Sequence, residues 1–375
     1  MFDTSRIRLT KAILVVLFVG SLLLSACYGP RGWPAAQFDG NTLFAGTMDG
    51  RVVALNPESG ARKWEWQPQK QTGNITSVFS SCAQSGQFKG GPFYGAPEVA
   101  NGTIYLGYYT GVVYAIDGAR GIEVWGHDIK SNIAAGVTVA DDTVFVGSSS
   151  GKLSALYAGD GSLKWEFLTK NEVWAKPEIA DGIVYFGSLD HNLYALNAND
   201  GMEKWVFETG GGIGSSPLVV DGVVYVGSFD KKFYAIDADS GTSKWVFDEA
   251  GNWFWAEALY QNGIVYACSL DNKVYAIYAG NGTLAWPKPY DAGSLLKSSP
   301  VIANGVLVVA SEEGKVFGLD LETGEKRWQF DDIEAKVLSP LCTDGNKVYI
   351  NSQDNRLYAL EGGTGRQAWS VSLAK

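Results

Sequence analysis

The chain contains few of the residues on which catalysis and metal binding usually depend. Its 375 residues include two histidines, four cysteines and three methionines. His127 and His191 lack the spacing of metal ligands, and we expect both in loop or hairpin positions at the surface. Neither a His-Glu-x-x-His sequence nor a phosphate-binding loop occurs. The sequence therefore predicts no catalytic residues, no bound metal and a protein that is not an enzyme.

The cysteines do not form a recognisable disulfide framework. Besides Cys27 there are Cys82, Cys268 and Cys342, an odd number for an oxidising compartment. Cys268 and Cys342 fall in expected strands and are interpreted as buried small apolar residues. The redox state of Cys82, Cys268 and Cys342 stays open.

Basic residues are outnumbered by acidic ones. The chain has 30 Lys and Arg against 40 Asp and Glu, which gives a net charge of −10. Without residues 1–26, which hold three basic residues and one acidic residue, 27 Lys and Arg face 39 Asp and Glu, and the net charge is −12. An acidic protein repels nucleic acid and anionic lipid heads. We expect no nucleic-acid partner.

An apolar run, Ala12 to Leu24, follows Arg6, Arg8 and Lys11 at the amino terminus. It is too short and wrongly flanked for a spanning helix, but it fits a secretory signal. The sequence Leu24-Ser25-Ala26-Cys27 resembles the lipobox of bacterial lipoproteins, whose Cys becomes the lipidated first residue. An ordinary signal, with Cys27 incidental, is the alternative. The resemblance implies a signal peptide over residues 1–26, lipid attachment at Cys27 and a short tether over 27–32.

Tyr28 follows Cys27 where the inner-membrane retention rule of two-membraned bacteria would require Asp. By that rule the protein is exported and anchored to the outer membrane, facing the periplasm. In a host with a single membrane it would lie on the outer face of the cell membrane. The sequence leaves open which kind of host is involved.

The prominent feature that the sequence does contain is a repeat that ends in tryptophan. The unit reads Ala-[Ile/Leu], a few small or polar residues, Gly, three residues and Trp, with Gly318-Leu319 in place of the first pair in one unit. The tryptophans are Trp64, Trp125, Trp165, Trp205, Trp245, Trp286, Trp328 and Trp369, at intervals of 61 and then 40 to 42 residues. A period in this range, made of short β-branched and aromatic runs, is typical of a propeller or β-array.

One unit shows four expected strands. The runs 216–220, 223–227, 233–236 and 244–247 are apolar, and Asp221-Gly222 separates the first two. Asp-Gly accepts the positive φ of a two-residue hairpin turn. Units stacked radially bury both faces of each sheet. We predict an all-β fold, a single eight-bladed propeller of four-stranded antiparallel blades over residues 33–375.

The phrase at residues 234–245, Tyr-Ala-Ile-Asp-Ala-Asp-Ser-Gly-Thr-Ser-Lys-Trp, resembles the tryptophan-docking motif of pyrroloquinoline-quinone-type propeller repeats. The resemblance covers nearly all of residues 33–373. WD40 repeats have a similar length, but no Trp-Asp pair occurs here. The resemblance implies that each of the eight tryptophans packs against the neighbouring blade and has a structural role.

The first tryptophan interval is about 20 residues longer than the others, which places an insertion at about residues 67–91, between blades one and two. It starts at an outer strand and ends at the axis. We expect it to cover or border the channel mouth, since long loops in a minimal repeat are often functional.

The residues before each first strand vary from unit to unit and are expected at the mouth of the central channel. Aromatic rings with a few polar groups suit a peptide, a sugar or a planar ligand. The alternative is that the rings only plug the narrow axis. The candidate binding face consists of Tyr94, Trp174, Lys176, Trp253, Trp255, Glu257 and Lys297.

Two functional classes remain. In blade number, length and anchor the chain resembles the propeller lipoproteins of the outer-membrane β-barrel assembly machinery, which implies a protein-interaction or assembly scaffold at the cell envelope. Two features depart from that family. Residues 366–373 supply the last outer strand at the carboxyl end, and only five residues separate Cys27 from Trp33. The partners would be envelope proteins of unknown identity, and the propeller itself is expected to be monomeric.

The second class is a small-ligand binder for a sugar, a peptide or a quinone, or a degenerate quinoprotein. Quinoprotein dehydrogenases of the resembled superfamily are longer and carry adjacent cysteines against the quinone and a set of calcium-binding acids. This chain has no Cys-Cys pair. We therefore expect no pyrroloquinoline quinone or other cofactor.

Overall fold

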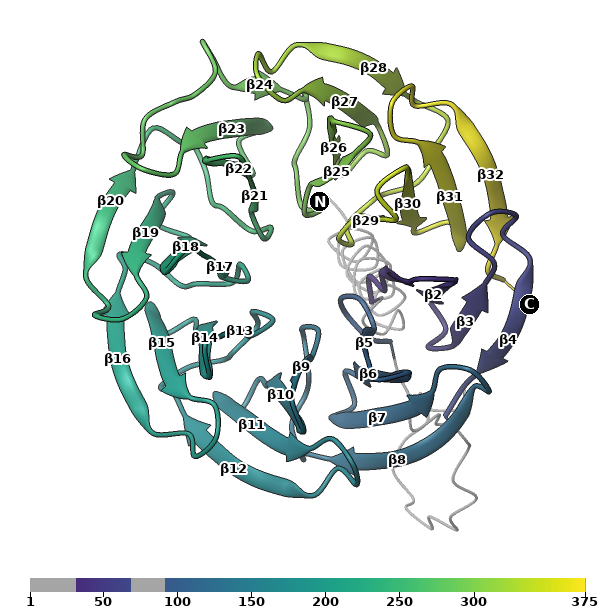
Figure 1. Ribbon diagram of the computed structural model, residues 1–375, viewed down its shortest axis with the longest axis vertical. Coiled ribbons are helices and arrows are strands. Elements are labelled where there is room, and N and C mark those ends of the chain that lie inside the picture. The colour runs from purple at the N-terminus through teal and green to yellow at the C-terminus, as the bar shows by residue number, and fades with distance from the viewer. Residues whose placement is uncertain (1–31, 69–91, 375) are drawn as a thin grey trace, which may run out of the picture. The chain divides into compact units, whose positions relative to one another are not determined.

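The apolar runs of each repeat become the four strands of one blade. The computed structural model describes residues 32–68 and 92–374, which form a ring of eight antiparallel sheets around a central axis (Figure 1). In blade five, Asp221 and Gly222 have φ of 51° and 71° between β17 and β18. The Asp-Gly hairpin expected from sequence is confirmed, because both turn residues adopt the left-handed conformation.

The strands run from the axis outward in chain order within each blade. Blade one holds β1 (Ala36–Asp39), β2 (Thr42–Gly46), β3 (Val52–Leu55) and β4 (Arg62–Trp66). Blade two holds β5 (Glu98–Ala100), β6 (Thr103–Gly107), β7 (Val112–Asp117) and β8 (Ile122–Asp128). Blade three holds β9 (Thr138–Ala140), β10 (Thr143–Gly147), β11 (Lys152–Tyr157) and β12 (Leu163–Leu168). Blade four holds β13 (Glu178–Ala180), β14 (Ile183–Gly187), β15 (Asn192–Asn197) and β16 (Glu203–Glu208).

The second half of the ring repeats the arrangement. Blade five holds β17 (Leu218–Val220), β18 (Val223–Gly227), β19 (Phe233–Asp237) and β20 (Ser243–Phe247). Blade six holds β21 (Leu259–Gln261), β22 (Ile264–Cys268), β23 (Lys273–Tyr278) and β24 (Tyr290–Asp291). Blade seven holds β25 (Val301–Ala303), β26 (Val306–Ala310), β27 (Val316–Asp320) and β28 (Lys326–Phe330). Blade eight holds β29 (Cys342–Thr343), β30 (Lys347–Ser352), β31 (Arg356–Glu361) and β32 (Gln367–Ser372). The predicted fold class, eight blades of four antiparallel strands, is confirmed.

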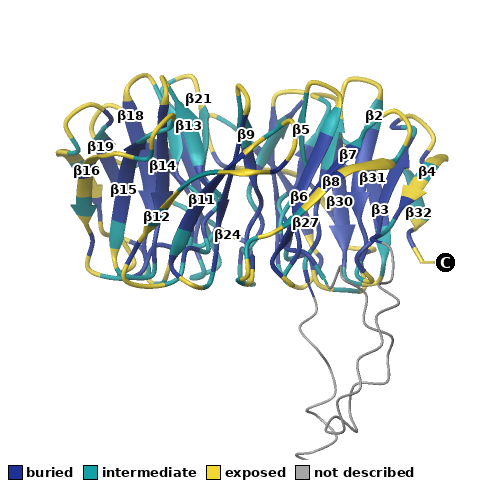
Figure 2. Cartoon of the chain, turned by 90° about the horizontal axis from the view of Figure 1, so that it is seen from below, coloured by how far each residue is buried: buried dark blue, intermediate teal, exposed yellow. Residues whose placement is uncertain are grey.

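The core lies between the blades. The second strands are largely apolar and buried on both faces, as β14 and β18 show. Outer strands such as β12 and β16 alternate buried or half-buried residues with exposed ones (Figure 2). This difference follows from position, because a middle strand has a blade on each side whereas an outer strand faces water. Apolar clusters fill each junction between neighbouring blades, including the junction of blades eight and one.

The docking tryptophans join each blade to the next. In blade four, the indole Nε1–H of Trp205 donates to the carbonyl of Ala238 at 2.9 Å, and its ring covers Gly241 in blade five. A Cβ on Gly241 would come 2.7 Å from the ring, so the glycine of the repeat is needed for this approach. The same donor bond is made by Trp64, Trp125, Trp165, Trp245, Trp286, Trp328 and Trp369.

The ring closes between blades eight and one without exchange of a strand. The predicted outer strand at the carboxyl end is present as β32, which pairs with β31 of its own blade. Trp369 donates to the carbonyl of Pro57 in blade one at 2.9 Å. Arg51, only 2% exposed, donates from Nη2 to the carbonyl of Leu373 at 2.7 Å and pairs with Asp49 and Glu65.

Blade six departs from the repeat at its outer edge. β24 spans only Tyr290–Asp291, and Trp286 stands before it in irregular chain. Pro287 and Pro289 explain the interruption, because proline lacks the N–H that an outer strand donates to its neighbour.

The structure corrects one expectation and leaves others untested. His127 does not lie in a loop or hairpin. It belongs to β8, which continues past Trp125 because β7 offers pairing partners as far as Val112. His191 does lie in a hairpin, with φ of 77°. Within residues 32–68 and 92–374 no helix has the length and apolar character to cross a membrane.

The two cysteines interpreted as buried are confirmed. Cys268 is 1% exposed in β22 and Cys342 is 7% exposed in β29, and both are free thiols. Burial raises the pKa of each thiol to about 12, which keeps both protonated. The predicted signal peptide, lipid attachment at Cys27, Cys82 and nearly all of the insertion at about 67–91 lie outside the described residues, so these stay predictions.

Candidate binding site at the propeller axis

The chain approaches the axis in the same way in every blade. From blade two to blade seven, each outer strand connects to the inner strand of the next blade on the face that also carries the hairpins between second and third strands. Alternate residues of an extended segment point to the same side. The segments leading into the inner strands therefore present every second side chain to the channel.

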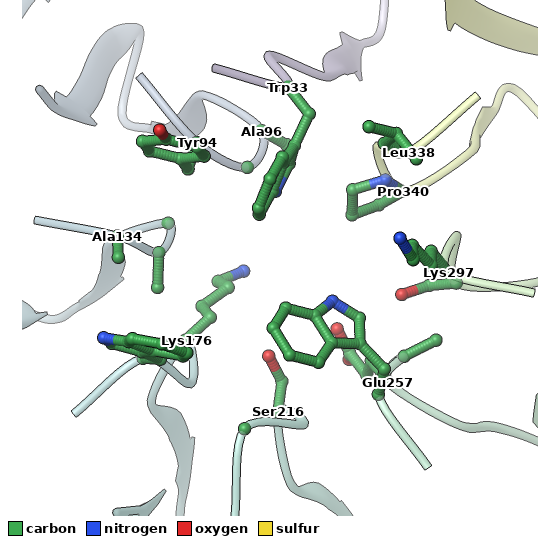
Figure 3. A pocket seen from close by; sticks show the side chains of 18 of the residues that line it. Trp33, Tyr94, Ala96, Ala134, Lys176, Ser216, Glu257, Lys297, Leu338 and Pro340 are labelled. Carbon is green, nitrogen blue, oxygen red and sulfur yellow. The ribbon is translucent and has the colours of Figure 1, made fainter. Parts of the chain in front are cut away.

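These residues enclose a cavity of about 480 Å³ to which all eight blades contribute (Figure 3). Its outermost layer, the mouth ring, is formed in blades two to eight by the residue four positions before the inner strand. The mouth ring is Trp33, Tyr94, Ala134, Trp174, Gly214, Trp255, Lys297 and Leu338. A second ring lies two positions further along the chain and contains Ala96, Gly136, Lys176, Ser216, Glu257, Ser299 and Pro340.

A third level begins with the inner strands themselves. Glu98 and Glu178 are the first residues of β5 and β13, again two positions further along. Nζ of Lys176 lies 2.9 Å from Oε2 of Glu98, so an ion pair joins blade four to blade two. Lys176 is deep within the ring yet keeps about a third of its side chain (34%) open to the channel. Three carboxylates, those of Glu98, Glu178 and Glu257, thus share one ammonium group.

Burial and the excess of negative charge change the pKa values of Glu178 and Glu257. Burial, together with the neighbouring charge of Glu257, raises the pKa of Glu178 to about 7. Burial also raises the pKa of Glu257, although Lys176 opposes the shift. Burial lowers the pKa of Lys176, but the carboxylates of Glu98 and Glu257 outweigh burial, and the net shift is upward. At neutral pH Lys176 is charged, whereas Glu178 is divided between its charged and neutral forms.

Lys297 belongs to a separate ion pair at the other side of the mouth. Its Nζ lies 3.0 Å from Oε2 of Glu312, whose Oε1 lies 2.6 Å from Nζ of Lys336. Hydrogen bonding from Lys336 lowers the pKa of Glu312, so this carboxyl stays ionised. The positive charge of Lys297 is therefore already compensated by Glu312.

Aromatic rings run from the cavity to the surface. Phe229 stacks on Trp255 with centroids 5.7 Å apart and planes at 5°, and on Trp253 with centroids 4.6 Å apart and planes at 20°. Trp174 lies 6.4 Å from Trp255 at 59°. Trp253 is 41% exposed. We call Trp174, Trp255, Phe229 and Trp253 the aromatic ladder.

A second aromatic group belongs to blades one and two. Trp33 and Tyr94 meet edge to face with centroids 4.6 Å apart, and Tyr94 contacts Tyr109 at 5.5 Å. The indole Nε1–H of Trp174 is buried and has no hydrogen-bond acceptor among the described residues. The cavity thus combines apolar ring faces with the carboxylate of Glu257 and the ammonium group of Lys176.

Six of the seven residues predicted for the binding face line this one cavity: Tyr94, Trp174, Lys176, Trp255, Glu257 and Lys297. Trp253 does not line it and stands outside, stacked on Phe229. Trp33, Glu98, Glu178 and Phe229 also belong to this region and were not predicted from the sequence. Continuing in steps of two from Tyr94 and Trp174 would have found Glu98 and Glu178, whereas Trp33, three residues before β1, and Phe229, between β18 and β19, do not follow this count.

The lining does not fit pyrroloquinoline quinone. That cofactor is a tricarboxylic acid, and here it would face the carboxyl of Glu257, to which Glu98 and Glu178 add negative charge from behind the lining. Both lysines of the lining, Lys176 and Lys297, are already paired with glutamates. Within the described part of the chain, no group of three His, Cys, Asp or Glu side chains is arranged to hold a metal ion. We derive no reaction step through this cofactor.

Comparison with protein families gives two matches that divide the chain. Residues 134–375 match the family model described as the beta-propeller of beta-alanine-activating enzyme. Residues 29–125 match the model described as outer membrane protein assembly factor BamB.

Curated relatives match over short segments. The chain is 31% identical over 86 residues to the quinoprotein alcohol dehydrogenase PedH of Pseudomonas putida, which covers 21% of this chain and 14% of that protein. It is 30% identical over 82 residues to the outer membrane protein assembly factor BamB of Escherichia coli, covering 22% of this chain and 20% of that protein. The matched segment therefore spans only a small part of either relative.

Solved structures share the fold. BamB from Moraxella catarrhalis superimposes with a TM-score of 0.64 and 20% identity, over 74% of this chain and 84% of that one. The computationally designed protein Ika8 superimposes with a TM-score of 0.74 and 17% identity, over 89% of this chain and 97% of that one. Together with the family matches, these similarities confirm the resemblance to pyrroloquinoline-quinone-type, BamB-like propeller repeats.

Proposed function

The chain belongs to the β-propeller family described as that of beta-alanine-activating enzyme, and from this membership and its BamB-like repeats we propose that it is a scaffold for assembly at the cell envelope. In this role the ring binds envelope proteins and catalyses no reaction. The partners are proteins that assemble the outer membrane, the process named in the description of its BamB relatives.

The aromatic ladder is the observation that carries this proposal. It begins in the cavity at Trp174 and ends at the exposed ring of Trp253, so it offers a continuous apolar surface across the mouth. Tryptophan and tyrosine at such positions are frequent hot spots of protein interfaces, because they bury a large area and keep one hydrogen-bonding group. A partner side chain could insert between the ladder and the Trp33–Tyr94 pair.

The location is part of the proposal. A signal peptide over residues 1–26 would export the chain, lipid on Cys27 would anchor it, and residues 27–32 would tether the propeller of residues 33–375. A lipid anchor with more than one acyl chain holds a protein stably on a membrane. In a two-membraned host the ring would face the periplasm from the outer membrane.

A small-ligand binder is the second candidate function. The cavity of about 480 Å³ has the size of a small-molecule site, and its lining pairs indole rings with a few polar groups. This candidate needs no partner protein.

The scaffold role is tested by removing indole rings of the aromatic ladder and measuring how much partner protein still binds. We expect Trp253→Ala and Trp255→Ala to reduce several-fold the outer-membrane assembly proteins that copurify with the full-length chain from membranes, as counted by quantitative mass spectrometry. Tyr278→Ala is the matched control, since Tyr278 is a 46% exposed aromatic at the end of β23, on the opposite face. Equal recovery from all three variants would reject the mouth as the binding face.

A further inference from the structure

We propose that the axial cavity is a binding site for an organic cation, an alkylammonium group held between the rings of Trp174 and Trp255 and the carboxylate of Glu257, with the charge of Glu178 acting on it from behind the lining. This inference does not depend on the scaffold role, because it concerns the interior of the ring and not its exposed mouth.

The charge inside the ring is unbalanced. Glu98, Glu178 and Glu257 act on one another and on a single cation, Lys176. Lys176 makes its short contact with Glu98. Like charges held close together in a partly buried site raise their mutual energy, and a second cation would relieve it.

Glu178 and Glu257 have no hydrogen bond or ion pair shorter than 4.0 Å in the described part of the chain, although both are at least half enclosed. Buried or half-buried carboxylates in folded proteins are usually paired, because an uncompensated charge away from water is costly. Glu257 lines the cavity itself. An ammonium group in the cavity would supply the missing partner.

The rings of Trp174 and Trp255 lie where they can contact an ammonium group in the cavity. Trp174 and Trp255 precede Lys176 and Glu257 by two residues, so each ring lies on the channel side directly above a charged side chain. The two indoles are 6.4 Å apart and inclined at 59°. Indole faces attract cations, and they do so more strongly where water is partly excluded.

The spacing of the acids favours an organic cation over a metal ion. Among residues 32–68 and 92–374 no three acidic, His or Cys side chains converge closely enough to hold a metal. The cavity of about 480 Å³ has ample room for an alkyl chain. Carboxylates spread around an aromatic-walled space match a cation whose charge is attached to apolar carbon.

Binding should depend on pH in a defined direction. The pKa of Glu178 is about 7, and the charged groups that face it are Glu257, Lys176 and Glu98. Near pH 6 Glu178 is mostly neutral and near pH 8 mostly ionised, whereas Lys176 stays charged throughout. The affinity for an ammonium ion should therefore rise several-fold from pH 6 to pH 8, with release of a proton on binding at pH 7.

Titration of the full-length protein with n-butylammonium, followed by calorimetry and tryptophan fluorescence, tests the proposal. We expect saturable binding of n-butylammonium and none of butyrate, which has the same chain and the opposite charge. A peptide with an acetylated amino terminus and one lysine forms a second arm. Tighter binding of this peptide than of n-butylammonium would identify a protein lysine as the source of the cation, and weaker binding a free amine.

Variants separate the site from general effects on folding. Glu257→Gln should weaken n-butylammonium binding about tenfold, the equivalent of one lost charged contact. Glu178→Gln should remove the pH dependence. Lys176→Met should strengthen binding, because it removes the competing internal cation. Glu325→Gln, at an exposed glutamate beside β28, is the control and should change nothing.

Weaker binding by Glu257→Gln could also result from poor folding. The stronger n-butylammonium binding expected for Lys176→Met could not, so this variant keeps the test decisive. Butyrate binding as well as n-butylammonium would overturn the proposal. So would the absence of saturable binding by either cation, or unchanged affinity in Glu257→Gln with intact thermal unfolding.

Discussion

Nζ of Lys176 lies 2.9 Å from Oε2 of Glu98, and this ion pair links blade four to blade two inside the ring. Because Lys176 is engaged by Glu98, the other two carboxyls of the channel, Glu178 and Glu257, are left with weaker compensation. The stability of the propeller should consequently respond to the ionisation of these acids.

Glu178→Gln should stabilise the protein at pH 8. The pKa of Glu178 is about 7 in the folded protein, above its ordinary value of 4.5, so the folded state binds more protons between these two pH values. Stability contributed by the neutral carboxyl is present at low pH and is lost as pH rises through 7. The substitution should remove this loss, on the order of 2 kcal/mol at pH 8.

Urea unfolding of both proteins at pH 5 and pH 8 measures this effect. The difference between wild type and Glu178→Gln should be larger at pH 8 than at pH 5. A difference that is the same at both pH values would contradict the assignment of a raised pKa to Glu178.

Trp205→Ala should destabilise the ring by about 3 to 5 kcal/mol. Trp205 is 9% exposed, packs on Gly241 of the next blade and donates to Ala238. Trp253→Ala removes an exposed indole and should cost less than about 1 kcal/mol. Denaturant midpoints compare the two, and an unchanged midpoint for Trp205→Ala would rule out stabilisation by the docking tryptophan.

Arg51→Ala should loosen the closure of the ring. The substitution leaves the carbonyl of Leu373 without its donor and Glu65 without the guanidinium of Arg51, at a cost of about 3 kcal/mol. Amide hydrogen exchange should then accelerate in β32 and β4 more than in β18. Arg366→Ala, at an exposed arginine just before β32 in blade eight, serves as control. Uniform exchange in β32 and β18 would show that closure does not rest on Arg51.

Cys27→Ala should leave a folded propeller that no longer sediments with membranes. The reason is that the proposed lipid on Cys27 is the link to the bilayer. Metabolic labelling with palmitate measures the modification directly, and label incorporated into Cys27→Ala would refute lipidation at this residue.

Much of the fold could be predicted from the sequence because the repeat is local. The strands of blade five coincide closely with the apolar runs, and the turn at Asp221-Gly222 has the conformation that those residues favour. The outer strand of blade six was harder to predict from its local sequence. Pro287 and Pro289 interrupt this strand, yet Trp286 stays in the core, where it is 2% exposed.

The residues around the channel mouth could be predicted in part. Tyr94, Trp174 and Trp255 stood out because they are large aromatic residues before an inner strand. Glu98 and Glu178 did not, because they look like ordinary strand residues until the ring brings blades two and four together. Contacts between blades two and four form only when the whole ring closes. The sequence of a single repeat therefore does not indicate them.

In the proposed scaffold role, the face that carries the aromatic ladder binds the partner. A photoreactive amino acid placed at Trp253 and, separately, at Tyr278 on the opposite face tests it most directly in living cells. Crosslinks to outer-membrane assembly proteins should form from position 253 and not from position 278. Crosslinks to those proteins from position 278 alone would contradict it.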